Sequence, residues 1–133
     1  MKTIQHVVQE LLLHMGNRDL NPLIQLFEDQ VDWYIPGDEG RVSWLGKRQH
    51  KDEIKVFFET LWANTRPLST TLDGIFTQDD DAVIAAEFSV QMLPTGSTLT
   101  SPVFIMLKIN RQGKIIKYRL LEDSFLVSES MKS

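Results

Sequence analysis

The sequence predicts an α+β domain in which helices cover one face of a mainly antiparallel sheet. Before Pro67, apolar residues recur at helical spacing in three segments, whereas later segments alternate apolar and polar residues at the period of two typical of strands. Helices followed by strands are an α+β arrangement. A length of 133 residues and a hydrophobic content of 42% fit one domain, residues 1–133, with a single core.

The first helix is predicted from an apolar stripe that ends near Gly16 and Asn17. A second, shorter helix follows and carries Pro22 in its first turn, where proline is tolerated. The two stripes consist of Ile4, Val7, Val8, Leu11, Leu12 and Met15 in the first helix and of Leu20, Leu23, Ile24 and Phe27 in the second. Together they predict a helical hairpin.

A β-prone run from Val31 to Ile35 predicts a strand that Pro36 and Gly37 end, and a polar loop follows over residues 38–41. The third helix is the clearest element, because its apolar stripe is wide and stops before Pro67. That stripe consists of Ile54, Phe57, Phe58, Leu61 and Trp62. It requires a large apolar surface to pack against.

Three further strands are predicted over residues 84–92, 99–109 and 115–121, with turns at Pro94-Thr95-Gly96 and at residues 110–113. They form an antiparallel meander. These strands carry apolar residues on both faces, which predicts a homodimer through the outer face of the sheet. Residues 128–133 are expected to be a loose C-terminal tail.

Composition excludes several functions. The net charge of −4, with both signs scattered, argues against nucleic acid and against an anionic membrane surface as partners. The absence of cysteine excludes disulfides, thiolate metal sites and cysteine nucleophiles. The first segment is unlike a signal peptide and no run is long enough to cross a membrane, so a soluble, cytoplasmic protein is expected.

No metal or other cofactor is predicted. His6, His14 and His50 lie in separate elements without the spacing of metal ligands. The acidic residues 79–81 are expected to form a turn, because the glycine and glutamate of a calcium loop are missing. Residues 47–51 are expected to be a solvated basic loop, since no glycine-rich phosphate motif accompanies them.

Several short segments occur along the chain in the order found in a known group of proteins. They are Val7-Val8-Gln9, residues 17–20, Leu26-Phe27-Glu28-Asp29, Trp33-Tyr34-Ile35-Pro36-Gly37, Trp44-Leu45-Gly46, Asp52-Glu53-Ile54, Phe57-Phe58, Gly113-Lys114-Ile115 and Glu122-Asp123-Ser124. Over nearly the whole chain this series resembles SnoaL-like and ketosteroid isomerase-like proteins of the nuclear transport factor two-like superfamily. The resemblance implies a cone, in which three N-terminal helices close one side of a strongly curved sheet around an apolar cavity. It also implies dimerisation through the outer sheet face, as in many relatives.

The catalytic residues of the best-known relatives do not carry over. The tyrosine and the two acids of steroid isomerases correspond by resemblance to Leu11, to Ile35 and to either Phe104 or Ile105. None of these side chains exchanges a proton. The Arg-x-Asp pair of limonene epoxide hydrolase-like relatives is missing from Ala85-Ala86-Glu87-Phe88, and the acid that those hydrolases and polyketide cyclases carry on the last strand corresponds to Leu120.

Glu122 is the candidate catalytic residue. It shares one strand face with Ile116, Tyr118 and Leu120, so it lies near the cavity rim if Tyr118 points inward. A carboxylate against apolar walls has a raised pKa and can act as acid or base. The alternative is that Glu122 is a solvated residue at the strand end, beside an Asp123 that caps the chain.

The candidate ligand-binding residues are mainly aromatic, because flat apolar rings with one polar atom suit a ring-containing ligand. They are Trp33, Trp44, Phe104, Tyr118, His14 and Leu120. Trp33 and Trp44 are equally compatible with a place in the core, His14 with a solvated helix end, and Trp62 is assigned to the core.

Three functions remain open from the sequence. The first is a SnoaL-like protein that binds a hydrophobic or ring-containing metabolite in an apolar pocket. The second is a SnoaL-like isomerase, cyclase or hydrolase that uses a rearranged carboxylate. The third is a non-catalytic homodimeric interaction module whose cavity is filled by its own side chains.

Overall fold

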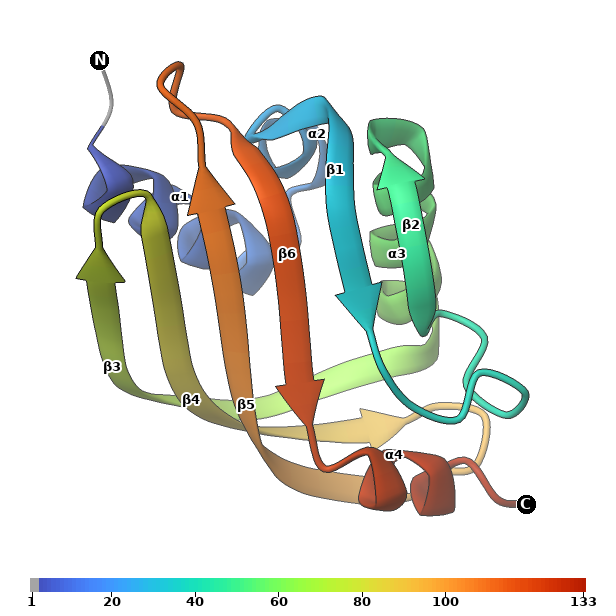
Figure 1. Ribbon diagram of the computed structural model, residues 1–133. Coiled ribbons are helices and arrows are strands. Elements are labelled where there is room, and N and C mark those ends of the chain that lie inside the picture. The colour runs from blue at the N-terminus through green and yellow to red at the C-terminus, as the bar shows by residue number, and fades with distance from the viewer. Residues whose placement is uncertain (1–2) are drawn as a thin grey trace.

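The computed structural model of the chain describes residues 3–133 and has helices on one face of a bent sheet (Figure 1). The helices α1 (Ile4–Gly16), α2 (Leu20–Ile24) and α3 (Lys51–Asn64) lie on the same side of the sheet, and α4 (Ser124–Ser130) lies beside its bent end. This arrangement confirms the predicted α+β cone. None of the helices within residues 3–133 has both the length and the apolar character that a membrane crossing requires.

The sheet has six strands in the order β2-β1-β6-β5-β4-β3. Their bounds are β1 (Phe27–Ile35), β2 (Gly46–His50), β3 (Thr65–Gln78), β4 (Asp81–Met92), β5 (Thr98–Ile109) and β6 (Ile115–Glu122). All neighbours are antiparallel except β1 and β6, which run parallel. The long strands β3, β4 and β5 bend strongly (Figure 1), and β3 has two register shifts, a feature that bends strands.

Several elements differ from the sequence prediction. The second helix ends at Ile24, and Phe27 begins β1, where it pairs with Ile115 of β6. Strand β2 replaces part of the expected basic loop, and β3 was not predicted as a strand. Both lie at sheet edges and are mostly exposed, so neither shows the apolar alternation from which strands are recognised.

The C-terminal prediction is wrong for residues 128–130, which belong to α4 rather than to a loose tail. Ser128 and Ser130 are buried, and the Ser130 hydroxyl donates to the carbonyl of Val127 at 2.7 Å. Thr95 further fixes the helix by donating to the carbonyl of Ser130 at 2.7 Å. Serines can be buried here because each finds a hydrogen-bond partner, which composition alone does not reveal.

The inward-facing residues of the sheet form rows across the strands. One row consists of Trp33, Tyr118, Leu107 and Ala82, which are paired in succession and are each at most 2% exposed. Phe57 and Phe58 of α3 pack against Trp33, with ring centroids 4.9 and 5.9 Å away. This row is therefore the solid part of the core.

Candidate functional site

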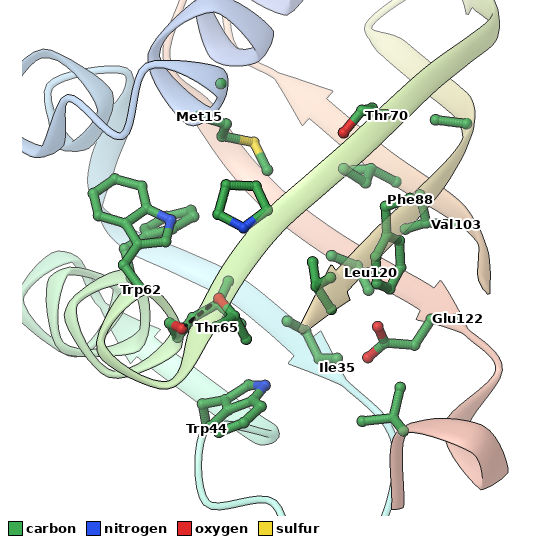
Figure 2. A pocket seen from close by; sticks show the side chains of 18 of the residues that line it. Met15, Ile35, Trp44, Trp62, Thr65, Thr70, Phe88, Val103, Leu120 and Glu122 are labelled. Carbon is green, nitrogen blue, oxygen red and sulfur yellow. Dashed lines mark hydrogen bonds between the residues drawn. The ribbon is translucent and has the colours of Figure 1, made fainter. Parts of the chain in front are cut away.

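The pocket lies in the half of the cone where the strands bend, and its volume is about 500 Å³. This volume is within the range of small-molecule sites. Aliphatic and aromatic side chains make up most of its wall (Figure 2). The sheet contributes Ile35, Ile84, Ala86, Phe88, Val103, Ile105 and Leu120; the helices and loops contribute Leu12, Met15, Trp44, Leu45, Phe58, Leu61, Trp62 and Val127.

Strand register explains which sheet residues reach the pocket. Ile84, Ile105 and Leu120 are paired across β4, β5 and β6 and form the row next to the solid core row. The following row consists of Ala86, Val103 and Glu122, because inward positions recur every second residue. Both rows line the pocket. Glu122 thus belongs to an otherwise apolar row.

The loop between β1 and β2 and helix α4 together make one wall. Trp44 and Leu45 come from the loop, Val127 comes from α4, and all three are buried. The Ser128 hydroxyl donates to Asp38 Oδ2 at 2.7 Å and accepts from Arg41 Nη1 at 2.9 Å. The bond from Ser128 holds the pKa of Asp38 below its usual value. These bonds fasten the loop that carries Trp44 to the C-terminal helix.

Glu122 is the acidic group of the pocket. Its carboxylate extends from the end of β6 toward the pocket interior, near Ile35 and Leu120 (Figure 2). Within residues 3–133 it forms no hydrogen bond or ion pair that would stabilise its charge, and burial raises its pKa from 4.5 to about 7. A carboxyl group with this pKa is partly protonated and partly ionised at neutral pH, so it can donate or accept a proton.

Arg18 is the basic group of the pocket wall. Its Nη1 donates to the carbonyl oxygens of Trp62 and Thr65 at 3.1 and 3.0 Å, and its Nη2 donates to Thr65 Oγ1 at 3.1 Å. Its guanidinium carbon lies 5.9 Å from the ring centroid of Trp62. Burial lowers the pKa of Arg18, but an arginine stays charged because its pKa begins far above neutral.

Of the predicted site residues, Trp44, Leu120 and Glu122 line the pocket. Trp33 and Tyr118 do not: they lie in the neighbouring core row, where their rings stack with centroids 4.0 Å apart and planes 6° apart. Burial raises the pKa of Tyr118, so the hydroxyl stays protonated. The inward orientation predicted for both residues is correct, but the open space begins two residues further along each strand.

The predictions for Phe104 and His14 are not supported by the structure. Phe104 points to the outer face of the sheet and is 46% exposed, while its neighbour Ile105 faces the pocket. His14 is half-buried outside the pocket wall, because Leu12 and Met15 present the pocket-facing side of α1.

Sequence reasoning did not assign most of the pocket residues to the site, and Trp62 and Arg18 are two of them. Trp62, assigned to the core, packs against it but also lines the pocket. Arg18 lies in the turn between α1 and α2, where no apolar periodicity signals a direction. Among residues 3–133 there is no cluster of three or more His, Asp or Glu side chains that could hold a metal ion.

Comparison with known proteins finds a matching family model and solved structures with the same fold. The model of the SnoaL-like domain matches residues 8–118. An NTF2-like protein from Burkholderia thailandensis superposes with a TM-score of 0.87 at 19% identity, over 100% of both chains. A proposed isomerase from Rhodopseudomonas palustris superposes with a TM-score of 0.85 at 17% identity, over 98% of this chain and 97% of that one.

A third similar structure is TerC co-crystallised with polyporic acid, with a TM-score of 0.82 at 17% identity over 98% of each chain. At these identities the structural likeness shows the fold alone. None of the curated proteins compared with this chain matches it.

The raised pKa of Glu122 predicts a pH-dependent cost to folding. As pH rises from 4.5 to 7 the unfolded chain releases the Glu122 proton first, so the stability of the folded protein falls by at most about 3 kcal/mol. Glu122→Gln removes this cost and should therefore gain stability relative to the wild type between pH 5 and pH 8. Urea denaturation at both pH values measures the gain.

Glu87→Gln, at an exposed outer position of β4, is the control and should leave the pH dependence nearly unchanged. If the stability difference between Glu122→Gln and the wild type is the same at both pH values, the carboxyl group of Glu122 is not desolvated.

Proposed function

This chain belongs to the SnoaL-like domain family, and we propose that its pocket binds a small, largely apolar organic molecule. The observation that carries the proposal is the pocket of about 500 Å³ whose wall is apolar except for a few groups such as Arg18 and Glu122. Apolar walls supply affinity through buried area, and a small number of polar groups orient the ligand. The cocrystal of TerC with polyporic acid supports an organic ligand for this fold.

Two indole rings favour a ligand that contains a ring. Trp44 from the loop and Trp62 from α3 both line the pocket (Figure 2). Their flat faces offer large apolar area with little loss of conformational entropy. A bound ring placed against either indole would change its fluorescence, which makes ligand entry measurable without a label.

Acid–base catalysis is a second candidate function, favoured by the pKa of about 7 at Glu122. A general acid or base works best when its pKa lies near the working pH. The carboxylate would remove a proton from carbon next to a carbonyl group of the ligand and return one to the same or another position. Pure binding would need no titrating group in the pocket wall.

We also propose that the protein is a homodimer through the outer face of the sheet. Phe104, Leu121, Met106 and Phe76 belong to two adjacent outward rows and are 43 to 63% exposed. Large apolar side chains gathered on one sheet face are typical of a surface covered by a partner. An isologous contact between two copies would cover them.

Blocking the pocket should prevent binding. The neutral fluorescent probe N-phenyl-1-naphthylamine is expected to bind the wild type and to quench tryptophan fluorescence. Ala86→Leu adds three carbon atoms to the pocket wall and should weaken probe binding by about tenfold or more, because overfilling displaces the ligand. Fluorescence titration measures both constants.

The matched control is Ala85→Leu, at the residue directly before Ala86 in β4, where the side chain faces outward. It should leave probe affinity unchanged. Equal effects of the two substitutions, or no binding to the wild type, would contradict the assignment of this pocket as a ligand site.

Exchange of a carbon-bound proton tests the catalytic candidate. The bicyclic ketone 2-tetralone, incubated with the protein in D₂O, should take up deuterium beside its carbonyl group faster than in buffer, as followed by NMR. Glu122→Gln should abolish the acceleration and still bind N-phenyl-1-naphthylamine, because the amide keeps the size but cannot exchange the proton. Glu87→Gln should retain it. Exchange that is as fast in Glu122→Gln as in the wild type would leave binding as the function.

The dimer is tested by sedimentation equilibrium over micromolar to millimolar concentrations. The wild type should sediment as a dimer, and Phe104→Asp as a monomer, since it places a charge in the apolar face. Phe125→Asp, at a position of α4 that is 68% exposed, is the control and should stay dimeric. A wild type that is monomeric throughout refutes the proposal.

A further inference from the structure

Arg18 brings a positive charge into the pocket wall. None of the acidic groups within residues 3–133 forms an ion pair with it, and its neighbour Asp19 is exposed. The other charged residue of the wall is Glu122. A guanidinium at the edge of an apolar cavity attracts an anionic or strongly accepting oxygen atom, since few other groups there compete for it.

The guanidinium is held in place and still has free donors. Of its five N–H groups, two on Nη1 and one on Nη2 serve Trp62 and Thr65. Nε–H and the second Nη2–H form no hydrogen bond within residues 3–133. The Thr65 hydroxyl donates in turn to the carbonyl of Leu61 at 2.7 Å, which fixes its lone pairs toward Arg18. A donor group fixed in advance loses little entropy when a ligand binds.

The backbone at Arg18 supports a role for its side chain. Its φ of 51° lies in the left-handed region, at the residue after the C-cap of α1. The N–H of Asp19 donates to the carbonyl of His14, and the N–H of Arg18 donates to the carbonyl of Met15. These two bonds form a turn at the C-terminus of the helix, in which glycine usually occupies the position of Arg18. A residue with a side chain is strained in this conformation. The long side chain offsets this cost partly by binding carbonyls at the end of α3.

The pocket separates the two charged groups. Trp62 and Thr65, which bind Arg18, lie across the pocket from Glu122 in Figure 2, and apolar residues such as Ile35 and Leu120 lie between them. A ligand that reaches from Arg18 to Glu122 meets a basic group at one end and a carboxyl group at the other. An anionic group suits the Arg18 end, whereas the Glu122 end suits an uncharged group.

We propose that the ligands of this pocket are organic acids: an apolar or ring-containing body with one carboxylate, or a comparable anionic oxygen group, that pairs with the free N–H groups of Arg18. This inference rests on the proposed function and specifies its ligand class. Arg18 acts in it as a binding residue that selects the ligand and sets which end points to Glu122.

A pair of matched ligands tests the inference in the wild-type protein. The anion 1-naphthoate and the neutral 1-naphthamide share the same ring body, and each is used to displace N-phenyl-1-naphthylamine. The naphthoate should bind about tenfold more tightly, a typical gain from a charge-assisted pair. Equal displacement by the two compounds overturns the inference.

Variants assign the preference to Arg18. Arg18→Gln should abolish the preference for naphthoate by weakening naphthoate binding more than naphthamide binding. Arg18→Lys should keep part of the preference, because a lysine retains the charge without the planar pair of donors. The control Arg66→Gln removes an exposed positive charge next to Thr65 and should keep the full preference. If Arg18→Gln does not fold, the lysine variant and the comparison of the two ligands in the wild type still decide whether Arg18 selects an anionic ligand. A preference for naphthoate that survives in Arg18→Gln refutes the role of Arg18.

The outcomes also separate this inference from the proposed function. If N-phenyl-1-naphthylamine does not bind the wild type, the pocket proposal itself fails. If the probe binds and Ala86→Leu blocks it, but naphthoate and naphthamide compete equally, the pocket is a ligand site and only the assignment of organic acids is wrong.

Discussion

The stacked rings of Trp33 and Tyr118 divide the interior of this protein. Their centroids are 4.0 Å apart, both residues are at most 1% exposed, and Phe27, Phe57 and Phe58 surround the tryptophan. Stacked and edge-on rings contribute about 0.5 to 1.5 kcal/mol per pair beyond the burial of area. At this stack the interior is filled by aromatic rings. Two residues further along β1 and β6 the next inward residues, Ile35 and Leu120, are aliphatic and face open space.

The two charged residues of the pocket, Glu122 and Arg18, have different surroundings. Among the described residues Glu122 has no partner that stabilises its ionised form, and burial shifts its pKa toward neutral. Arg18 keeps its charge, and backbone carbonyls of α3 and the Thr65 hydroxyl accept its hydrogen bonds. A charge near an apolar wall costs folding energy unless it is well bonded, and such groups are concentrated at functional sites. The proposed binding of a ligand would give both charged groups a role in this apolar wall.

The sheet has two apolar faces because its strands alternate between two environments. On β5 the inward residues Val103 and Ile105 line the pocket, whereas Phe104 and Met106 point outward and are 44 to 46% exposed. A shift of one residue in register would exchange the two sets. The edge strands β2 and β3 are mostly polar or exposed, which suits strands that have a neighbour on one side only. The same alternation thus builds the pocket wall and the proposed dimer surface.

Local periodicity determined much of the fold: α1, α3 and β4 to β6 follow directly from apolar residues at a spacing of 3.6 or two, and Glu122 was assigned to the strand face of Leu120 in the same way. The local pattern does not show where along that face the core ends and the pocket begins. Tyr118, Leu120 and Glu122 have the same alternation, yet Tyr118 lies in the core and the other two line the pocket. Only the tertiary structure decides where the pocket begins, because this depends on where the helices end and where the strands bend. The mostly exposed strands β2 and β3 depend on pairing with neighbouring strands. Ser128 of α4 depends on hydrogen bonds with Asp38 and Arg41, which lie 90 and 87 positions away in the sequence. Arg18 likewise reaches the pocket only because a left-handed turn after α1 directs it across the end of α3, a contact between residues 44 and 47 positions apart.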